Sequence, residues 1–337
     1  MVTSTVTLSL TEAEELVMAA LCAVGTHSQN ARSVAAALVA AEAEGQIGHG
    51  FSRLADYAAQ VRSGKVNGMA RPLCSAQNDA ALTIDARNGF AYPALDIAID
   101  VGITAARRHG CASVAVTRSH HCGALSIQVA KIAREGLIGL MVANTPAAIA
   151  PWGASTPVFG TNPIAFAAPR LNNDPLVIDL SLSKVARGKI MHANKVGEAI
   201  PEGWAVDADG KPTTDPEAAL AGSMLPMGGA KGTALALMVE ILAAVLPNAN
   251  PSRSVSSFFT AEGPPSGSGQ FLLVLAPPDI EAFIARLELI LTFINDLEGA
   301  RLPGDRRVAS IFMAREKGLS VPRHYIDYAR ELAGHHA

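Results

Sequence analysis

The sequence lacks most of the patterns by which a nucleotide- or metal-binding protein is usually recognised. Its 337 residues contain neither a G-x-G-x-x-G motif nor a Walker A motif, so neither a Rossmann dinucleotide site nor a P-loop is predicted. The four cysteines, at positions 22, 74, 111 and 122, are far apart and form no C-x-x-C pair. That spacing excludes a zinc ribbon and a thioredoxin-like centre. If the protein binds a nucleotide, the site must be of another kind.

Charge and aromatic residues are also scarce. Charged residues make up 17% and aromatic residues 5% of the chain, and the formal net charge is -3. No basic run or stacking platform for nucleic acid is present. The longest strongly apolar run, residues 233–246, contains Glu240 and is too short to span a bilayer. The N-terminal residues lack the basic and apolar regions of a signal peptide. We therefore expect a cytoplasmic protein with free thiols, no membrane segment and no nucleic-acid partner.

Hydrophobic residues make up 49% of the chain, enough for a large core. The first 70 or so residues favour helices, the first of which is expected to begin with a capping box of Thr11 and Glu14. From about residue 81, strands and helices are mixed, residues 249–270 read as a long loop, and the C-terminal residues are helical again. Strands are expected at residues 81–88, 111–119, 137–144, 162–170, 175–183 and 271–277, and helices at 92–110 and 120–136. The predicted fold class is mixed α/β (α+β).

The segment GQIGHGFSRL, residues 45–54, has the residue types of a carboxylate-binding catalytic site. His49 lies between two glycines, and its imidazole can exchange a proton near neutral pH. Arg53 follows four residues later, on the same face if a helix has begun, and a guanidinium can hold a carboxylate. The pair suits a substrate with an acid group next to a C=O or C=N bond. A surface histidine beside a solvated arginine is the alternative.

Three further segments combine turns with ligand-binding residue types. TRSHHCGAL, residues 117–125, lies where a strand passes into a helix, and one of its two histidines is expected to face a pocket. Gly160 and Thr161 belong to a turn that can expose amides to an anion. Gly228 and Gly229 precede Lys231 at the start of a long apolar helix, which favours a phosphate. Each segment alone could also be an ordinary turn or helix start. No histidine or carboxylate spacing supports a metal site.

Taken together, the segments resemble one family across nearly the whole chain. GHGFSRL, SHHCGAL, FGTNPIAFAAPR, DLSLSKVARGKI, LPMGGAKG and RLPGDRR follow the order found in the malate/L-lactate dehydrogenase family of NAD(P)-dependent oxidoreductases, which lacks the Rossmann fold. The resemblance implies a homodimer. It also implies a helical domain formed by residues 1–75 and 278–337, and a central cofactor-binding sheet domain of residues 76–277.

The resemblance also implies roles for individual residues. His49 would be the proton donor, Arg53 the carboxylate anchor, and Thr161 a further substrate contact. The cofactor, NADPH with NADH as the alternative, would contact His121, Cys122, Gly123, Ala124, Leu125, Gly160, Asp179, Arg187, Gly188, Gly228, Gly229, Lys231, Arg301, Gly304 and Arg307. Two positions depart from the family. Gly48 stands where a serine is usual, and Lys189 stands where the imino-acid reductases have a relay aspartate.

Among the members, SHH, RLPGDRR and the Gly-Gly-x-Lys-Gly stretch resemble the cyclic imino-acid reductases most. The predicted reaction is the reduction of delta-1-pyrroline-2-carboxylate or delta-1-piperideine-2-carboxylate to L-proline or L-pipecolate. The alternative is a 2-oxo-acid/2-hydroxy-acid dehydrogenase acting on malate, lactate or a sugar acid. In both, charge that develops on the reduced group would be neutralised by the His49 proton.

Overall fold

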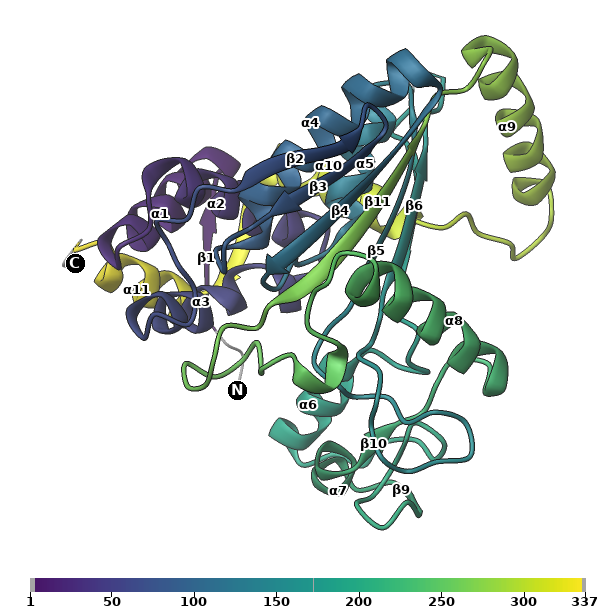
Figure 1. The fold of residues 1–337 in the computed structure, drawn as a ribbon. Helices are drawn as coiled ribbons and strands as arrows, with labels where there is room; N and C mark the ends of the chain where they lie inside the picture. Colours follow the sequence, from purple (N-terminus) through teal and green to yellow (C-terminus); the bar gives the residue numbers. More distant parts are fainter. Residues whose placement is uncertain (1–3, 172, 335–337) are drawn as a thin grey trace.

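A mixed seven-stranded sheet forms the centre of the molecule (Figure 1). The computed structural model describes residues 4–171 and 173–334. The strands run in the order β2-β3-β4-β11-β5-β6-β7, and β3 and β4 are the parallel pair. The strands are β2 (Leu73–Asn78), β3 (Ala81–Asp85), β4 (Cys111–Ser119), β5 (Ile138–Ala143), β6 (Ile164–Ala168), β7 (Leu176–Leu180) and β11 (Ser268–Leu275). The mixed class and the predicted strands are confirmed. β2 was not predicted, because its residues are all exposed and carry no apolar pattern.

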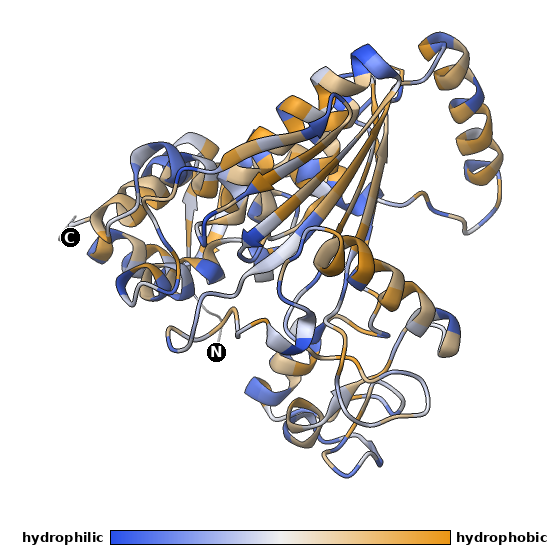
Figure 2. Ribbon diagram, in the orientation of Figure 1, coloured by the Kyte–Doolittle hydropathy of each residue, from blue (hydrophilic) through white to orange (hydrophobic). Residues whose placement is uncertain are grey.

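The sheet is covered on both faces, which explains why its strands read as continuous apolar runs. In β11, Leu272 and Val274 belong to a core with α4 (Ala91–His109) and α5 (Leu125–Arg134). The alternate residue Phe271 belongs to a core on the opposite face. Figure 2 shows the apolar residues following the strands and the facing sides of the helices. Burying each large side chain contributes about 1.5–3 kcal/mol.

The two ends of the chain meet in a terminal lobe beside the sheet (Figure 1). Its helices are α1 (Leu10–Ala23), α2 (Ser28–Ala43), α3 (Leu54–Arg62), α10 (Asp305–Lys317) and α11 (Arg323–Leu332). Two short strands that were not predicted, β1 (Thr5–Leu8) and β12 (Leu319–Pro322), pair antiparallel and join the two ends. The lobe is therefore not purely helical.

Two helix starts differ from the prediction. The capping box of α1 is formed by Ser9 and Glu12, not by Thr11 and Glu14, because β1 ends at Leu8 and the helix begins two residues earlier. The helix expected at 120–136 begins only at Leu125. The reason is Gly123, whose φ of 66° is left-handed. A Cβ at that glycine would lie 2.6 Å from the Tyr92 hydroxyl.

Helix α9 (Ile280–Asn295) lies apart from the terminal lobe although it falls in the predicted helical segment 278–337 (Figure 1). It stands beyond the opposite side of the sheet. One bidentate ion pair, between Arg170 and Glu288, ties it to the residues after β6. Leu291 is its one buried residue.

A second lobe covers the other face of the sheet. It contains α6 (Arg187–Val196), α7 (Pro216–Ala221), α8 (Ala230–Glu240) and the strands β8 (Ala205–Val206), β9 (Pro212–Thr213) and β10 (Ser223–Met224). A π-helical turn, Ile241–Val245, continues α8 along β11. Within the described residues, no helix combines the length and the apolarity that a membrane span requires.

Candidate active site

Two successive 3₁₀ turns place His49 and Arg53. The turns, Ile47–His49 and Phe51–Arg53, connect α2 to α3. Gly50 between them has no room for a side chain, since a Cβ would lie 2.0 Å from the Glu42 carboxylate. That carboxylate accepts the Phe51 amide at 2.9 Å. Because α3 begins only at Leu54, His49 and Arg53 do not share one helix face, as the sequence spacing had suggested they could. The turns bring them together instead.

His49 is half-buried and stacks on His121, with ring centroids 5.3 Å apart and an angle of 21° between the ring planes. Its Nδ1 atom is buried and has no hydrogen-bond partner in the described part of the chain. Burial, and secondly the charge of Arg53, lower the pKa of His49 to about 4. The ring is therefore a neutral imidazole at pH 7, and no carboxylate of residues 4–171 or 173–334 is bonded to it. Lys189, expected at the position of the relay aspartate of the imino-acid reductases, is exposed.

The Arg53 guanidinium is held from three sides. Its Nε donates to the Gly48 carbonyl at 2.8 Å, and Nη1 lies 3.4 Å from Asp56. Its central carbon lies 4.3 Å from the centroid of the Phe259 ring. The side chain is only 11% exposed. Such a fixed, partly desolvated guanidinium is suited to bind a carboxylate.

The two adjacent histidines have different surroundings, and it is His121 that stacks on His49. Its Nδ1 is joined to the Tyr57 hydroxyl by a 2.6 Å hydrogen bond, and Tyr57 is bonded to Tyr92 at 3.0 Å. His120 is fully buried, and neither ring nitrogen has a partner among the residues described. Burial lowers the pKa of His120 to about 3, and it lowers the pKa of His121 well below its ordinary value.

The residues after His121 lead into α5, where a carboxylate already occupies the helix start. Asp179 accepts the Ser126 amide at 2.8 Å, and burial raises its pKa. The buried Cys122 thiol has its pKa raised to about 12, so it is no nucleophile. Asp179 thus caps the helix start that the sequence assigned to the cofactor. Ala124 and Leu125 are buried at the same place.

Glu44 and Arg307 lie next to this helix start. Glu44 accepts a hydrogen bond from the Ser126 hydroxyl at 2.6 Å and forms an ion pair with Arg307, whose Nε lies 3.1 Å away. Burial raises the pKa of Glu44, and the charge of Arg307 partly offsets that rise. The Nη1 atom of Arg307 is buried without a partner within residues 4–171 and 173–334. One edge of this guanidinium therefore stays available to a ligand.

The glycine turns expected near the cofactor lie side by side. The Thr161 carbonyl accepts the Leu182 amide, and the Leu182 carbonyl accepts the Met227 amide, both at 2.8 Å. The backbone of Gly160 approaches so closely that a Cβ would lie 2.2 Å from the Thr145 hydroxyl. Gly228 and Gly229 follow Met227 with φ of 65° and 61° and begin α8 without a side-chain cap. Because no side chain in the described chain caps these first amides, the start of α8 is suited to bind an anion.

The remaining predicted cofactor residues lie outside this hydrogen-bonded group, and several of them are exposed. Arg187, the first residue of α6, is half-buried, and burial lowers its pKa. Gly188, Lys231 and Arg301 are exposed. Gly304 is the N-cap of α10, and a Cβ there would lie 3.1 Å from the Val177 carbonyl and 3.7 Å from Arg307 Nη1. The structure thus stacks His49 on His121 and places Arg53 where its charge lowers the pKa values of both rings. Among the described residues, these outer groups make no recorded contact with the three.

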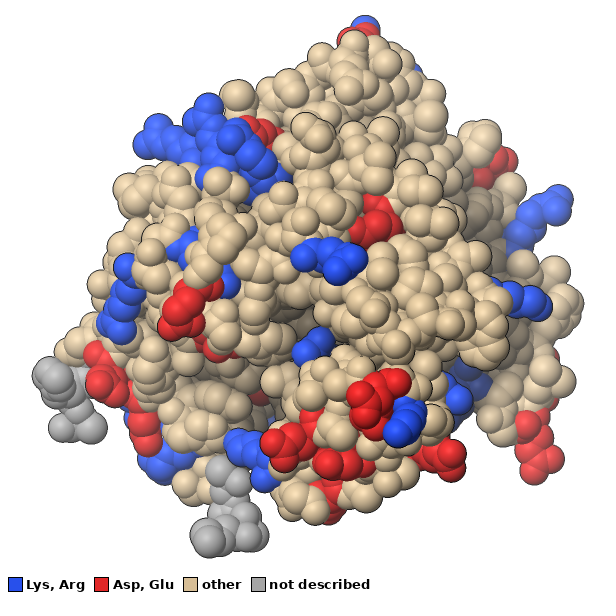
Figure 3. Space-filling model, turned by 60° about the horizontal axis from the view of Figure 1, so that its bottom comes forward, with Lys and Arg blue, Asp and Glu red and all other residues tan. Residues whose placement is uncertain are grey.

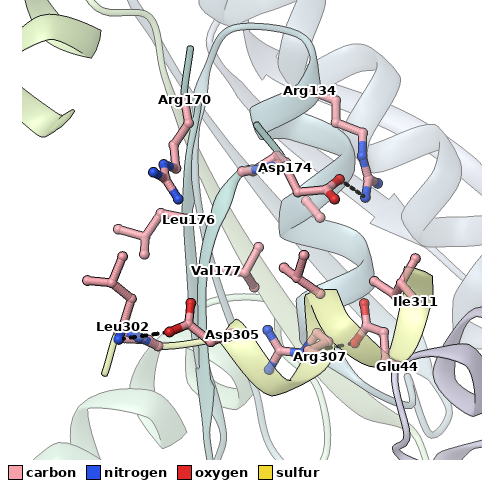
Figure 4. A pocket seen from close by; sticks show the side chains of 15 residues that line it. Glu44, Arg134, Arg170, Asp174, Leu176, Val177, Leu302, Asp305, Arg307 and Ile311 are labelled. Carbon is pink, nitrogen blue, oxygen red and sulfur yellow. Dashed lines mark hydrogen bonds and ion pairs between the residues drawn. The ribbon is translucent and has the colours of Figure 1, made fainter. Parts of the chain in front are cut away.

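A cleft beside α5 is lined by residues that include Glu44, Gly304 and Arg307 (Figure 4). Its arginines already have carboxylate partners, Arg134 with Asp174, Arg170 with Glu288 and Arg307 with Glu44. The face drawn in Figure 3 is hollowed near its centre, with both basic and acidic side chains around the hollow.

Several site residues were missed from the sequence. Tyr57 could have been found, because it lies four residues after Arg53, the spacing of one helix face. Phe258 and Phe259 could not, because they lie in the long loop and reach the site only through the fold. Phe258 contacts both histidine rings, with centroids 5.4 Å from His120 and 5.1 Å from His121.

Comparison with known proteins extends these observations. The sequence pattern of the family described as malate/L-lactate dehydrogenase matches residues 8–328. A (2R)-3-sulfolactate dehydrogenase (NADP(+)) of Chromohalobacter salexigens is 47% identical, covering 97% of this chain and 98% of that protein. A Delta(1)-pyrroline-2-carboxylate/Delta(1)-piperideine-2-carboxylate reductase of Pseudomonas putida is 38% identical, covering 98% of both.

The crystal structure of delta1-piperideine-2-carboxylate reductase from Pseudomonas syringae has the same fold. Its TM-score is 0.92 at 36% identity, covering 97% of this chain and 99% of that one. Identity is thus higher to the hydroxy-acid enzyme than to the imino-acid reductases, the reverse of the order that the motifs indicated. The chain belongs to the malate/L-lactate dehydrogenase family and is an NAD(P)-dependent oxidoreductase.

Proposed function

We propose that the protein is an NADPH-dependent dehydrogenase that interconverts a 2-oxo acid and the corresponding 2-hydroxy acid, with a sulfonated acid such as 3-sulfolactate as the leading substrate. The observation that carries the proposal is a neutral imidazole, His49, stacked on His121 near a fixed guanidinium, Arg53, whose charge helps to lower the pKa of His49. The 47% identity to a sulfolactate dehydrogenase supports the choice of substrate.

Arg53 would bind the carboxylate of the substrate. Its bond to the Gly48 carbonyl and its contact with Phe259 fix the plane of the guanidinium. A bidentate carboxylate would then hold the reacting carbon in one orientation, which is the geometric part of catalysis. Asp56 lies at the edge of the guanidinium at 3.4 Å, where it balances the charge without covering the other edge.

His49 would accept a proton from the hydroxyl group when the hydroxy acid is oxidised. A pKa of about 4 keeps the imidazole in the form that can accept this proton at neutral pH. In the reverse direction His49 must first gain a proton. A substrate carboxylate on Arg53 promotes this, because it neutralises one of the two causes of the low pKa. His121, stacked on His49 and bonded to Tyr57, limits rotation of the catalytic ring.

The chain offers groups that fit a dinucleotide. The free amides at the start of α8 after Gly228 and Gly229 suit a phosphate, and the buried, unpartnered Nη1 of Arg307 suits a polar or anionic group. A bound nicotinamide would supply the hydride. We propose NADPH rather than NADH, because the 47% relative is named for NADP(+). Arg187, half-buried at the start of α6, is our candidate for the 2′-phosphate.

A cyclic imino-acid reductase is the second candidate. The TM-score of 0.92 to delta1-piperideine-2-carboxylate reductase favours it, and the Arg53 and His49 roles would be the same. It ranks second because the chain is 38% identical to the imino-acid reductase of Pseudomonas putida but 47% identical to the sulfolactate dehydrogenase.

The test is a spectrophotometric assay at 340 nm. The purified enzyme is given 3-sulfopyruvate, oxaloacetate, pyruvate and the two cyclic imines with NADPH or NADH, and both sulfolactate enantiomers with NADP(+). The His49→Ala variant serves as the control for background oxidation. We expect the highest kcat/KM with a 2-oxo acid. Turnover of the imines alone would reject the main proposal in favour of the second candidate.

We also propose that the protein is a homodimer. Helix α9 buries one residue, Leu291, and exposes Leu289, Ile290 and Phe293. A helix of this length is marginal in water without packing, so a second copy is the natural partner for its apolar side. Light scattering after gel filtration should give the mass of a dimer for the wild type and of a monomer for Phe293→Asp. A monomeric wild type would reject the proposal.

We further propose that the enzyme is cytoplasmic. Cys22, Cys74, Cys111 and Cys122 are all free thiols in the structure, which suits a reducing compartment.

A further inference from the structure

Lys65 is a buried lysine that binds a loop instead of a carboxylate. It lies in the turn after α3 and is 3% exposed. Its Nζ donates to the carbonyls of Ser257, Thr260 and Glu262 at 2.7, 2.9 and 3.0 Å. No carboxylate lies within ion-pair distance of it in the described chain. Burying a lysine is costly, and three charge-assisted hydrogen bonds offset that cost.

Two neighbours of Lys65 bind the same loop. Gln60, fully buried on α3, donates to the Thr260 carbonyl at 3.0 Å. The Ser63 hydroxyl donates to the Ala261 carbonyl at 2.8 Å. The loop, residues 255–264, has no regular secondary structure. Gln60, Ser63 and Lys65 therefore supply the hydrogen bonds to these backbone carbonyls that a helix or a sheet would otherwise supply. We call residues 255–264 the Phe258 segment.

The Phe258 segment forms a wall of the candidate active site. Phe258 packs against both histidine rings, and Phe259 lies under the Arg53 guanidinium. Arg53 and Lys65 lie at the two ends of α3: Arg53 directly precedes the helix, and Lys65 closely follows it. The three hydrogen bonds of Lys65 hold the backbone on both sides of Phe258 and Phe259. Because α3 connects Lys65 to Arg53, these bonds fix Phe259 relative to Arg53.

We propose that Lys65 is a positioning residue for the substrate carboxylate, acting through the Phe258 segment on Arg53. The inference rests on the proposed function, in which Arg53 binds that carboxylate. Lys65 touches neither His49 nor Arg53 in any bond that the structure records. Its removal should therefore affect substrate binding much more than proton transfer. A lysine that only stabilised the fold would have no such selectivity.

The test compares Lys65→Met with Lys131→Met. Lys131 also makes one bonded contact, with Asp96 at 2.7 Å, but it is 40% exposed on α5. We expect Lys65→Met to raise the KM for the carboxylate substrate about ten-fold, the order expected when a cation–π contact is lost. The KM for NADPH and kcat should change less than about three-fold, and Lys131→Met should resemble the wild type. Backbone amides of residues 255–264 should exchange hydrogen faster in Lys65→Met only.

A double-mutant cycle with Phe259→Leu separates positioning from general stability. If Lys65 acts through Phe259, Lys65→Met should raise KM less than about two-fold in the Phe259→Leu background. Equal effects in both backgrounds, or faster exchange with an unchanged KM, would overturn the proposal. If Lys65→Met does not fold, Ser63→Ala, which removes one hydrogen bond to the same segment, replaces it with the same expectations on a smaller scale.

Failure of the proposed 2-oxo-acid reaction can be distinguished from failure of the positioning role of Lys65. If the wild type reduces none of the 2-oxo acids, affinity for oxalate in the presence of NADPH is measured by calorimetry instead of KM. A ten-fold loss of oxalate affinity in Lys65→Met would support the positioning role even then. Unchanged affinity would overturn it, whatever the true substrate is.

Discussion

Replacing His120 by phenylalanine should make the protein more resistant to acid. His120 is 1% exposed and packs edge-on against Tyr57, Phe90 and Phe258. Neither nitrogen is bonded in the part of the molecule described. A phenylalanine ring fits these aromatic surroundings and carries no group that can be protonated. At pH 7 the variant should be at least as stable as the wild type, because two unsatisfied nitrogens are removed.

The magnitude follows from proton linkage. The pKa of His120 is about 3 in the folded protein and roughly 6.5 in the unfolded chain. Between these values the unfolded chain binds a proton that the folded protein does not, so stability falls as the pH falls through this window. Integration from pH 7 to pH 5 gives a loss of about 2 kcal/mol from this one histidine. The free energy of unfolding of the variant should not decrease by this amount between pH 7 and pH 5.

The assay is urea unfolding followed by circular dichroism at pH 7 and pH 5. Glu42, Glu44 and Asp179, whose pKa values are raised by burial, act in the opposite direction but are common to both proteins and cancel in the comparison. The same substitution at the exposed His109 is the control. If the stability difference between His120→Phe and the wild type were the same at both pH values, His120 would not be a buried neutral group.

Three further predictions concern catalysis. His49→Ala should lower kcat by roughly 10²–10⁴-fold in steady-state assays, the usual effect of losing a general acid or base; an unchanged kcat would remove His49 from the mechanism. Arg53→Ala should mainly raise the KM for the carboxylate substrate, and a variant with wild-type KM would contradict the anchor role. The pKa of His49 is about 4, and reduction needs the protonated ring whereas oxidation needs the neutral ring. Therefore kcat/KM for reduction should fall as pH rises from 5 to 8, and kcat/KM for hydroxy-acid oxidation should not fall. Equal profiles in the two directions would contradict this assignment.

The central sheet could be predicted because its strands carry their own signal. β4, β5 and β11 are buried on both faces, so each is an apolar run bounded by polar or turn residues. The short strands β1 and β12 lack such a signal, since each is stable only as the partner of the other. Position 9 shows the limit of local patterns: Ser9 and Thr11 both have an acidic residue three places later, and the end of β1 decides which one caps α1.

The site was predictable where the chemistry lies in one segment. His49 and Arg53 stand four residues apart, and the double-histidine turn is conspicuous in the sequence. Lys65 was not predictable, because its acceptors are backbone carbonyls 192 to 197 residues further along. A carbonyl leaves no trace in residue identity. Lys65 therefore reads as an ordinary surface lysine until the fold is known.

The pairing of β1 with β12 has a consequence for the order in which the chain can acquire its structure. The partner of residues 5–8 is residues 319–322, and β11, in the middle of the sheet, comes from residues 268–275. During synthesis, β4 and β5 emerge long before the strand that must stand between them. Most of the chain must therefore leave the ribosome before the sheet or the terminal lobe can be completed. Such a topology has a high contact order and exposes apolar strand edges for a long time. Newly made chains should depend on chaperones more than the stability of the finished enzyme would suggest.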